Sequence, residues 1–338
     1  MDGNRHLRSS VRWRILFAPL MRWGVDGNRQ EDTMQRYILR RLFQSVLALL
    51  ALSMLIFLMS RLTGDPTMLM LPDDASREDI AQLRHALGLD QALPMQYWLF
   101  ISKAVQGDFG RSIKGQMPVR DMIAERLPYS FKLAAVALCI AVLLAFPLGV
   151  IAAVKKGTPL DTIANVIAVL GQSLPQFWVG MVLIQIFAVH LRWLPVAGVG
   201  SLWHYVLPAF TLGWFIVAGM MRLLRSSMLD IMGSEFVKLA RIKGVPERRV
   251  IWKHALRNAL IPVLTFGAIY LAVLITGAIL VETVFAWPGI GQLIYQGIVF
   301  RDFPVVQAVV LLTAVIVMAV NLLVDIIYAY VDPRIRYG

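Results

Sequence analysis

The chain has 338 residues, of which 58% are hydrophobic and only 16% are charged. This composition is too apolar for a soluble globular domain, and it indicates an integral membrane protein. A net charge of +12 can indicate nucleic-acid binding, but the basic residues here are divided among the segments between apolar runs, as membrane topology requires, so no nucleic-acid partner is expected.

The first 33 residues carry six arginines around an apolar core of only seven residues, Ile15 to Met21. A core of this length is too short to cross a bilayer, which takes about 20 apolar residues. No small-residue cleavage site follows it, and a second methionine that could start the chain stands at Met34. Residues 1–33 are therefore predicted to be a disordered or weakly amphipathic extension, or an artefact of the start site.

Six apolar runs without a charged residue follow, and they predict six transmembrane helices. The runs are Leu42 to Met59, Leu133 to Val154, Thr162 to Val189, Tyr205 to Met221, Asn258 to Val281, and Phe303 to Val324. The third run is long enough to tilt, and its helix breakers Gly171, Pro175 and Gly180 are tolerated where neighbouring helices satisfy the freed carbonyls. With the amino terminus inside, 22 of the 33 Lys and Arg lie in cytoplasmic segments, as the positive-inside rule favours. Both termini are therefore expected to be cytoplasmic.

The first segment expected outside the membrane, residues 61–128, is predicted to hold three amphipathic helices. Ser76 and Asp79 are spaced as a capping pair for the first helix, Pro94 opens the second, and Pro118 opens the third. Two interpretations remain open: a packed cap without a partner, or a platform for an extracytoplasmic protein.

The stretch from Ser234 to Pro262 is polar and basic but lies between two apolar runs, so it must lie in water while its neighbours lie in lipid. Its first helix presents Phe236, Leu239 and Ala240 on one face, and it is predicted to stop at Gly244-Val245-Pro246. This stretch is the main candidate for contact with another chain.

A second short helix is predicted from Glu247 to Ala259, and Pro262 is expected to open the fifth span. Two short helices joined at a bend bury little on their own, so their apolar side chains are expected to fill a groove on another chain. The alternative is that a basic loop here does no more than set the orientation of the protein.

Two further features stand at the ends of the last two spans. Glu282 and the Trp287-Pro288-Gly289 turn are predicted to lie at the external interface, where a tryptophan anchor is expected. Asp325 is predicted at the cytoplasmic end of the sixth span. Two interpretations of it remain open: a salt bridge or snorkelling at the helix end, or a role in transport.

The basic stretch resembles the "EAA" loop of bacterial ABC-importer permeases, in the form found in the dipeptide, oligopeptide, nickel and glutathione permease family. That loop reads E-x-Y-x-x-T-A-R-A-K-G followed by H-A-L-R-N-A-x-x-P. The matching residues here are Glu235, Phe236, Ala240, Arg241, Lys243, Gly244, His254, Ala255, Leu256, Arg257, Asn258, Ala259 and Pro262. The sequence departs from the pattern where Phe236 follows Glu235 directly. It also departs where Leu239 replaces Thr and Ile242 replaces the second Ala.

The resemblance implies functional roles for the residues of this loop. Alignment to the generic motif places its leading Glu on Lys238. The residues implied to couple to ATPases are Glu235, Phe236, Lys238, Leu239, Ala240, Arg241, Lys243 and Gly244. Those implied to support the loop are His254, Arg257, Asn258 and Pro262.

Motifs elsewhere resemble the same family, so the resemblance covers Met34 to Gly338. Those expected at the external face are Gly64, Asp65, Pro66, Glu282, Trp287, Pro288, Gly289, Arg301 and Asp302. The implied fold is an all-α integral membrane protein of the type I ABC importer permease class. It has six transmembrane helices, a helical extracytoplasmic segment after helix 1, and a cytoplasmic coupling-helix loop between helices 4 and 5.

The implied organisation is a first transmembrane helix at 34–60, the extracytoplasmic segment at 61–128, a permease core at 129–331 with its coupling loop at 227–261, and a cytoplasmic tail at 332–338. The implied partners are a homologous second permease, two cytoplasmic ABC ATPases and an extracytoplasmic solute-binding protein, in a bacterial inner membrane. No phosphate-binding loop G-x-x-x-x-G-K-[ST] occurs in the sequence, so ATP and Mg²⁺ are expected on the partner subunits and no cofactor on this chain.

Two other classes of protein are alternatives to this interpretation. An ion-coupled secondary transporter needs ionisable residues in mid-membrane, and the six apolar runs contain none. A membrane-embedded enzyme needs convergent catalytic side chains, but there is no H-E-x-x-H or G-x-S-x-G motif, and the single cysteine, Cys139, excludes a cysteine metal site. No catalytic or metal-binding residue is therefore expected. The sequence does not name the solute, which the family's range leaves open among dipeptides, oligopeptides, glutathione and nickel complexes.

Overall fold

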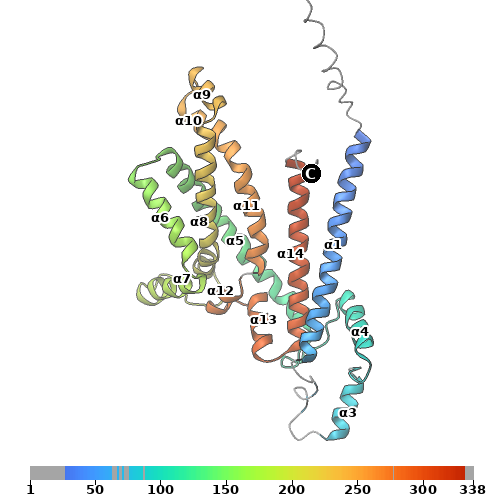
Figure 1. Cartoon of the computed structure of the whole chain (residues 1–338). Coiled ribbons are helices and arrows are strands. Elements are labelled where there is room, and N and C mark those ends of the chain that lie inside the picture. The colour runs from blue at the N-terminus through green and yellow to red at the C-terminus, as the bar shows by residue number, and fades with distance from the viewer. Residues whose placement is uncertain are drawn as a thin grey trace, which may run out of the picture.

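The computed structural model describes residues 27–331 except 63–66, 68–70, 72–75, 87 and 277, and the regular elements of that part of the chain are helices (Figure 1). The main helices are α1 Gly27–Leu62, α3 Arg77–Ala86, α4 Leu93–Val105, α5 Val119–Val154, α6 Pro159–Ser173, α7 Gln176–Leu183, η1 Ile184–His190, α8 Trp203–Met232, α9 Glu235–Ile242, α10 Glu247–Arg249, η2 Val250–Ala255, α11 Leu256–Thr276, α12 Ile279–Val284, α13 Ile290–Val299 and α14 Phe303–Val331. Residues 1–26 and the predicted motif Gly64-Asp65-Pro66 lie outside the described residues, as does the side chain of Asp325.

Five helices of the described chain are long and apolar enough to cross a membrane. They lie in α1, α5, α8, the continuous stretch from α10 to α11, and α14. A sixth span is present only if α6 and the α7–η1 helix count as one, and these two meet at an angle of 109°. The third predicted span, Thr162 to Val189, is therefore a bent pair of helices rather than one continuous helix.

The break between α6 and α7 has a local cause. Pro175 has no backbone N–H, and it disfavours the helical conformation for the residue before it. Leu174 is accordingly extended, with φ −84° and ψ 133°, and α7 restarts at Gln176 in a new direction.

Prolines do not break the chain everywhere they occur. α5 runs unbroken for 36 residues through Pro128, so the predicted third external helix and the second span are one helix. The stretch from Glu247 to Ile275 is likewise continuous, and Pro262 lies inside α11 rather than at the start of a span. The predicted helix from Glu247 to Ala259 begins where expected but continues past Ala259 and Pro262, because a membrane bundle tolerates a proline inside a helix where neighbours satisfy the freed carbonyl.

The other two predicted external helices are confirmed as α3 and α4. The backbone N–H and the hydroxyl of Ser76 both donate to the Asp79 carboxylate, at 3.1 and 2.6 Å. The Asp79 N–H donates back to the Ser76 hydroxyl at 3.1 Å, which completes the predicted capping pair. Gly88 then ends the segment with φ +66°, a conformation that glycine adopts without strain.

The centre of the bundle is α8. In its apolar 18-residue stretch 67% is buried inside the protein, compared with 11% in the corresponding stretch of α1. Small residues allow α8 to approach its neighbours closely. A Cβ on Gly213 would lie 2.8 Å from the carbonyl oxygen of Ala137 in α5, and one on Gly219 would lie 2.4 Å from the ring of Phe266 in α11. The helix that leads into the predicted coupling loop is therefore the helix around which the others pack.

The two ends of the bundle carry different elements (Figure 1). At one end α8 continues into α9 and α10, and α1 begins and α14 ends towards the same side. Towards the opposite side lie α4, α12 and α13. A small second core joins α13 to α14 and to the start of α5, through Val119, Ile123, Leu293 and Val305.

Candidate functional site

The helix α9 forms the tip of the predicted coupling loop and presents apolar side chains to the outside. Phe236, Leu239 and Ile242 are 47%, 51% and 82% exposed, and they follow one another at three-residue spacing on one side of the helix. Val237 points inward and is fully buried. The predicted face of Phe236, Leu239 and Ala240 is thus shifted, because Ala240 is half-buried and Ile242 is the most exposed of the set. We call Phe236, Leu239 and Ile242 the α9 apolar face.

The bend after α9 is built by the backbone around Gly244, where the sequence predicts a stop. Gly244 has φ +72°, and its N–H donates to the carbonyl of Arg241 at 2.9 Å. The N–H of Val245 reaches back to the carbonyl of Ala240 at 3.2 Å. These two bonds form a Schellman motif, which requires a left-handed residue at the position that Gly244 occupies. A Cβ at Gly244 would meet no atom within 4 Å, so the space beside the bend is open.

Ion pairs brace the loop on both sides of the bend. Arg241 donates from Nε and Nη2 to the two carboxylate oxygens of Glu247, at 3.1 and 2.7 Å, and so joins α9 to α10. The hydrogen bonds to Glu247 raise the pKa of the Arg241 guanidinium, which keeps it charged. Lys238 donates to Glu235 at 2.9 Å within α9. Four charged side chains of the predicted coupling loop therefore form ion pairs with one another within the loop. The side chain of Lys243, in contrast, is exposed.

The predicted support residues lie on the helix that follows the bend. The Asn258 side chain donates to the carbonyl of His254 at 2.7 Å, and Arg257 is exposed. The buried side of this helix is formed by Val250 and Ala255, each with no exposed surface, and η2 contacts both α8 and α9 there. The one predicted support residue with a side-chain hydrogen bond among those named here is Asn258, and that bond lies within its own helix.

A polar contact that sequence reasoning missed lies between α8 and α6, below the coupling loop. Arg225 donates from Nε and Nη2 to the Asp161 carboxylate at 2.6 and 2.8 Å. Asp161 also accepts from the backbone N–H of Gly157 at 3.0 Å and from the Asn165 amide at 3.0 Å. The Asp161 side chain is 8% exposed, and the Arg225 side chain is 23% exposed. Their signal in the sequence was weak: Asp161 stands directly before the third apolar run and Arg225 shortly after the fourth.

At the opposite end, Glu282 is fully buried rather than interfacial. Its carboxylate accepts from the Ser130 hydroxyl at 2.7 Å and from the N–H of Gln292 at 3.0 Å. Ser130 in turn accepts from the N–H of Ile290 at 2.8 Å, so the pair caps the start of α13. A Cβ on Gly289 would lie 2.2 Å from the Glu282 carboxylate, which explains why the turn needs glycine at that position.

Trp287 is also buried, with no exposed surface, so the prediction of an interfacial tryptophan anchor is wrong. Its indole N–H donates to the carbonyl of Tyr129 at 3.2 Å, and its ring contacts Tyr205 edge-on at 4.6 Å between centroids. A tryptophan with its N–H satisfied inside the protein gains more from packing than from a place at the lipid surface.

Asp302 is the third buried member of the predicted external motifs, at 4% exposure. It accepts from the Ser112 hydroxyl and from the N–H groups of Ile113 and Lys114, the latter two at 3.1 and 3.3 Å. It therefore fastens the segment before α5 to the start of α14. Its neighbour Arg301 is exposed and has φ +54°. Among the described residues, no group of three or more His, Cys, Asp or Glu side chains could hold a metal ion.

Comparisons with known proteins cover most of the chain. Residues 34–134 match the family described as "Binding-prot-dependent transport system membrane comp, N-term", and residues 145–337 match "Binding-protein-dependent transport system inner membrane component". The chain is 43% identical over 305 residues to the Glutathione transport system permease protein GsiC of Escherichia coli strain K12, which covers 90% of this chain and 100% of that protein. GsiC of Shigella flexneri serotype 5b is similar to the same extent, at 43% identity.

Two solved structures resemble the fold. One is an inward-facing conformation of the MetNI methionine ABC transporter, with a TM-score of 0.51 and 20% identity, over 62% of this chain and 96% of that chain. The other is an amino acid ABC transporter with histidines, with a TM-score of 0.51 and 12% identity, over 62% of this chain and 94% of that chain. At these identities the likeness concerns the fold.

Proposed function

The chain belongs to the binding-protein-dependent transport system inner membrane component family, and we propose that it couples two cytoplasmic ATPases to a translocation pathway of which it forms half. It is an ABC importer permease subunit, with the all-α membrane fold of type I importer permeases. In this proposal ATP and Mg²⁺ bind to the ATPases, and the work of this chain is mechanical.

The observation that carries the proposal is the α9 apolar face. Phe236, Leu239 and Ile242 expose large apolar side chains on a short helix at the tip of the molecule. Exposed apolar side chains that share a helix face usually fill a groove on a partner. The bend at Gly244 and the Arg241–Glu247 pair join α9 to the helix that follows, so in this proposal a partner that moved α9 would move both.

A displacement of α9 would reach the core of the bundle through direct contacts. α9 contacts η2 and the end of α8, and α8 is the most buried of the spanning helices. The Asp161–Arg225 pair ties α8 to the start of α6 on the same side of the bundle. Rigid-body movements of this kind can switch a packed bundle between two arrangements, which would open the pathway to one side of the membrane and then to the other.

The proposed topology places α9 and both termini in the cytoplasm, with α4, α12 and α13 outside. The positive-inside distribution of Lys and Arg supports this orientation. The external end would then receive solute from a binding protein. A homologous second permease would cover part of the exposed apolar surface of α6 and α7, which includes Val169, Trp178 and Met181.

For the solute we propose a small peptide-like molecule, with glutathione as the first to test. The support is the relatives named as glutathione transport permeases, at 43% identity over 90% of the chain. Uptake of labelled glutathione and of dipeptides, each competed with the other in cells that contain the whole transporter, would rank the two classes.

The first experiment on coupling is to purify the chain in mild detergent with its native neighbours and identify what is retained. Recovery of two ATPase polypeptides and a second permease supports the proposal. A lone, homogeneous chain from an otherwise intact preparation contradicts it and favours a secondary transporter.

The second experiment replaces Gly244 with Arg, which should leave the chain inserted but remove ATPase stimulation and uptake. The matched control is Gly107→Arg, because Gly107 has φ +77°, has open space beside it and forms the same type of bend after α4, away from α9. Both variants carry the same backbone strain, so a loss confined to Gly244→Arg reports docking. Normal stimulation and uptake in Gly244→Arg at normal expression would contradict the proposed coupling site.

A further inference from the structure

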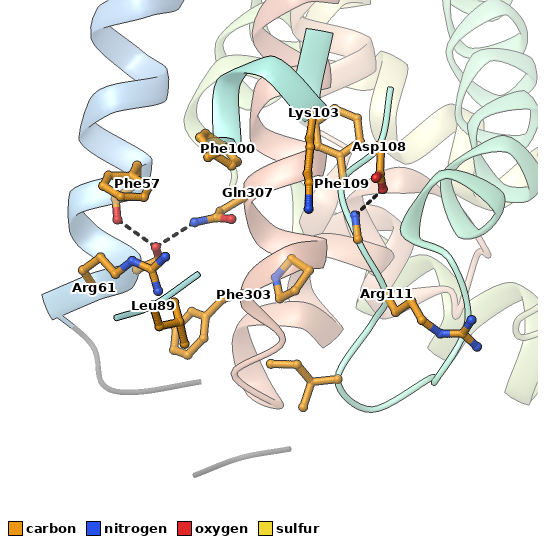
Figure 2. Close-up of a pocket in the computed structure, with 14 residues that line it drawn as sticks. Phe57, Arg61, Leu89, Phe100, Lys103, Asp108, Phe109, Arg111, Phe303 and Gln307 are labelled. Carbon is orange, nitrogen blue, oxygen red and sulfur yellow. Dashed lines mark hydrogen bonds between the residues drawn. The ribbon is translucent and has the colours of Figure 1, made fainter. Parts of the chain in front are cut away.

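A pocket of about 400 Å³ lies away from the coupling loop, between α1, α4, the segment before α5 and the start of α14 (Figure 2). Its volume is in the range of pockets that hold small ligands. Residues from regions far apart in the sequence line it, which include Phe57 and Arg61 of α1, Phe100 and Lys103 of α4, and Phe303 of α14. None of the residues discussed for coupling lines this pocket.

One part of the pocket wall is aromatic. Phe57 is 3% exposed, and its ring stacks on Phe100 at 5.9 Å between centroids. Phe303 faces the same space from α14 (Figure 2). Aromatic side chains of this kind form the apolar wall that glycerol and acyl carbons of a lipid would contact.

Cations converge on the pocket from two helices. The guanidinium of Arg61 lies 5.1 Å from the centroid of the Phe57 ring, and the Lys103 side chain extends into the pocket from α4 (Figure 2). Lys103 forms no ion pair with any residue that the structure describes. The acid of the lining, Asp108, accepts a hydrogen bond from the N–H of Gly110 at 2.9 Å and lies on the far side from Arg61.

Ser60 and Gln307 also line the pocket, and their polar groups could bond a hydroxyl-bearing headgroup. The Gln307 amide donates to the Ser60 hydroxyl at 2.7 Å, and Ser60 donates to the carbonyl of Phe57 at 2.8 Å. The Gln307 amide has a second N–H and its own carbonyl oxygen, both of which can bind a ligand hydroxyl. The pocket therefore combines positive charge, neutral hydrogen-bonding groups and an aromatic wall.

The pocket lies at the end of a membrane span, beside a surface suited to acyl chains. The apolar span of α1 runs from Ile38 to Leu62, so Arg61 stands in its last turn. The side of α1 next to Arg61 carries Leu55, Leu58 and Leu62, which are 53%, 38% and 78% exposed. A ligand that placed a negative headgroup at Arg61 could lay its chains along this apolar side.

We infer that this pocket binds the headgroup of an anionic phospholipid, with the phosphodiester between Arg61 and Lys103 and the acyl chains along α1. A zwitterionic lipid should bind more weakly, because Arg61 and Lys103 would repel the cation of its headgroup. Each basic residue near an anionic membrane surface favours binding by about fivefold, so the two together should favour an anionic lipid by about twenty-fivefold.

The test uses the full chain purified in detergent, with phosphatidylglycerol and phosphatidylcholine added in equal amounts, and the lipids bound to it are counted by native mass spectrometry. Arg61→Gln combined with Lys103→Gln is the test variant. Arg77→Gln combined with Arg84→Gln is the control, because it removes two cations from α3, outside the pocket lining. The inference requires retained phosphatidylglycerol in the wild type and the control, and its loss in the test variant.

Equal retention of the two lipids, or phosphatidylglycerol binding that survives in the test variant, overturns the inference. Added inorganic phosphate or glycerol phosphate identifies the source of the anion. If either displaces the lipid at millimolar concentration, the site recognises a free phosphate compound and the lipid assignment is wrong. Because no ATPase or transport is involved, failure here is distinct from failure of the proposed function.

Discussion

Proteins usually bury apolar side chains and expose charged ones, and each end of this bundle departs from that pattern in a different way. At the end with α12 and α13, the acids Glu282 and Asp302 are buried, and described groups of the same chain donate hydrogen bonds to both. At the α9 end, Phe236, Leu239 and Ile242 are large apolar side chains left exposed. The buried acids of the first end have their hydrogen-bond donors within this chain, whereas the exposed apolar side chains of the second end are the ones that the proposed function assigns to a partner. Substitutions at the first end should therefore affect folding, and those at the second should affect docking.

The largest effect is expected for Glu282→Ala. The substitution leaves the Ser130 hydroxyl and the N–H of Gln292 buried without their acceptor, which should lower the free energy of unfolding by about 3 kcal/mol. Unfolding of the purified chain in a denaturing-detergent titration measures this. Glu78→Ala, at an exposed position in α3, is the control and should change little. Equal stability of the two variants would show that the buried carboxylate is not structural.

A smaller effect is expected for Asp161→Asn, which lies at the coupling end but inside the helix packing. Removing the charge leaves Arg225 partly buried without its counter-ion, so the free energy of unfolding should fall by about 2 kcal/mol, and ATPase-driven uptake should fall with it. Thermal unfolding and uptake assays on the same preparation check both. Asp230→Asn, an exposed acid further along α8, is the matched control. Wild-type stability in Asp161→Asn would mean that the pair does not fasten α6 to α8.

The α9 apolar face gives the sharpest contrast between neighbouring residues. Ile242→Ser should leave stability unchanged and weaken ATPase binding about tenfold, which is about 1.4 kcal/mol. Val237→Ser, five positions away and fully buried, should instead lower stability. Binding of the purified ATPases to each variant in nanodiscs, together with its unfolding curve, separates the two effects. The comparison between the two ends fails if Ile242→Ser destabilises the fold as much as Val237→Ser does.

A still smaller effect is expected at the brace across the bend. Arg241 and Glu247 are 38% and 54% exposed, so solvent screening reduces the value of their pair to about 0.5 kcal/mol. A double-mutant cycle of Arg241→Gln and Glu247→Gln should return a coupling energy of that size for unfolding. Lys238→Gln, which removes the other ion pair of α9, provides the comparison. A coupling energy of several kcal/mol would show that the loop is held by this pair rather than by the glycine bend.

The smallest effect concerns pH in the segment between α1 and α5. A hydrogen bond to Asp90 at 2.6 Å raises the pKa of His85 above its ordinary value. The pair therefore stabilises the segment below the unfolded pKa of about 6.5, and this contribution is lost as the pH rises through the folded pKa. An NMR titration of the His85 ring should show a lower pKa in Asp90→Asn, whereas Asp108→Asn should leave it unchanged. A His85 pKa that is the same in both variants would contradict the contact.

Part of the fold could be predicted because it depends on neighbours in the sequence. Apolar runs without charge locate α1, α5, α8 and α14, since a bilayer requires such runs wherever a helix crosses it. The cap at Ser76 and the bend at Gly244 also follow local rules, because their hydrogen bonds join residues at most five positions apart.

Proline shows where local rules stop. Pro175 breaks the third apolar run, whereas Pro128 and Pro262 lie within continuous helices. All three lack the same N–H, so the outcome depends on whether surrounding helices can satisfy the freed carbonyl, which the local sequence does not specify.

The sequence by itself determined the membrane class, the approximate position of the spans, the polar loop that follows the fourth span and the glycine at its bend. Only the tertiary structure decided that Glu282 meets Ser130, 152 positions away, and that Arg225 meets Asp161, 64 positions away. It also decided that Trp287 is buried and that Ile242 rather than Ala240 points outward. The physical reason is that burial of a side chain depends on which distant helix packs against it, whereas crossing a bilayer depends on the composition of one continuous segment.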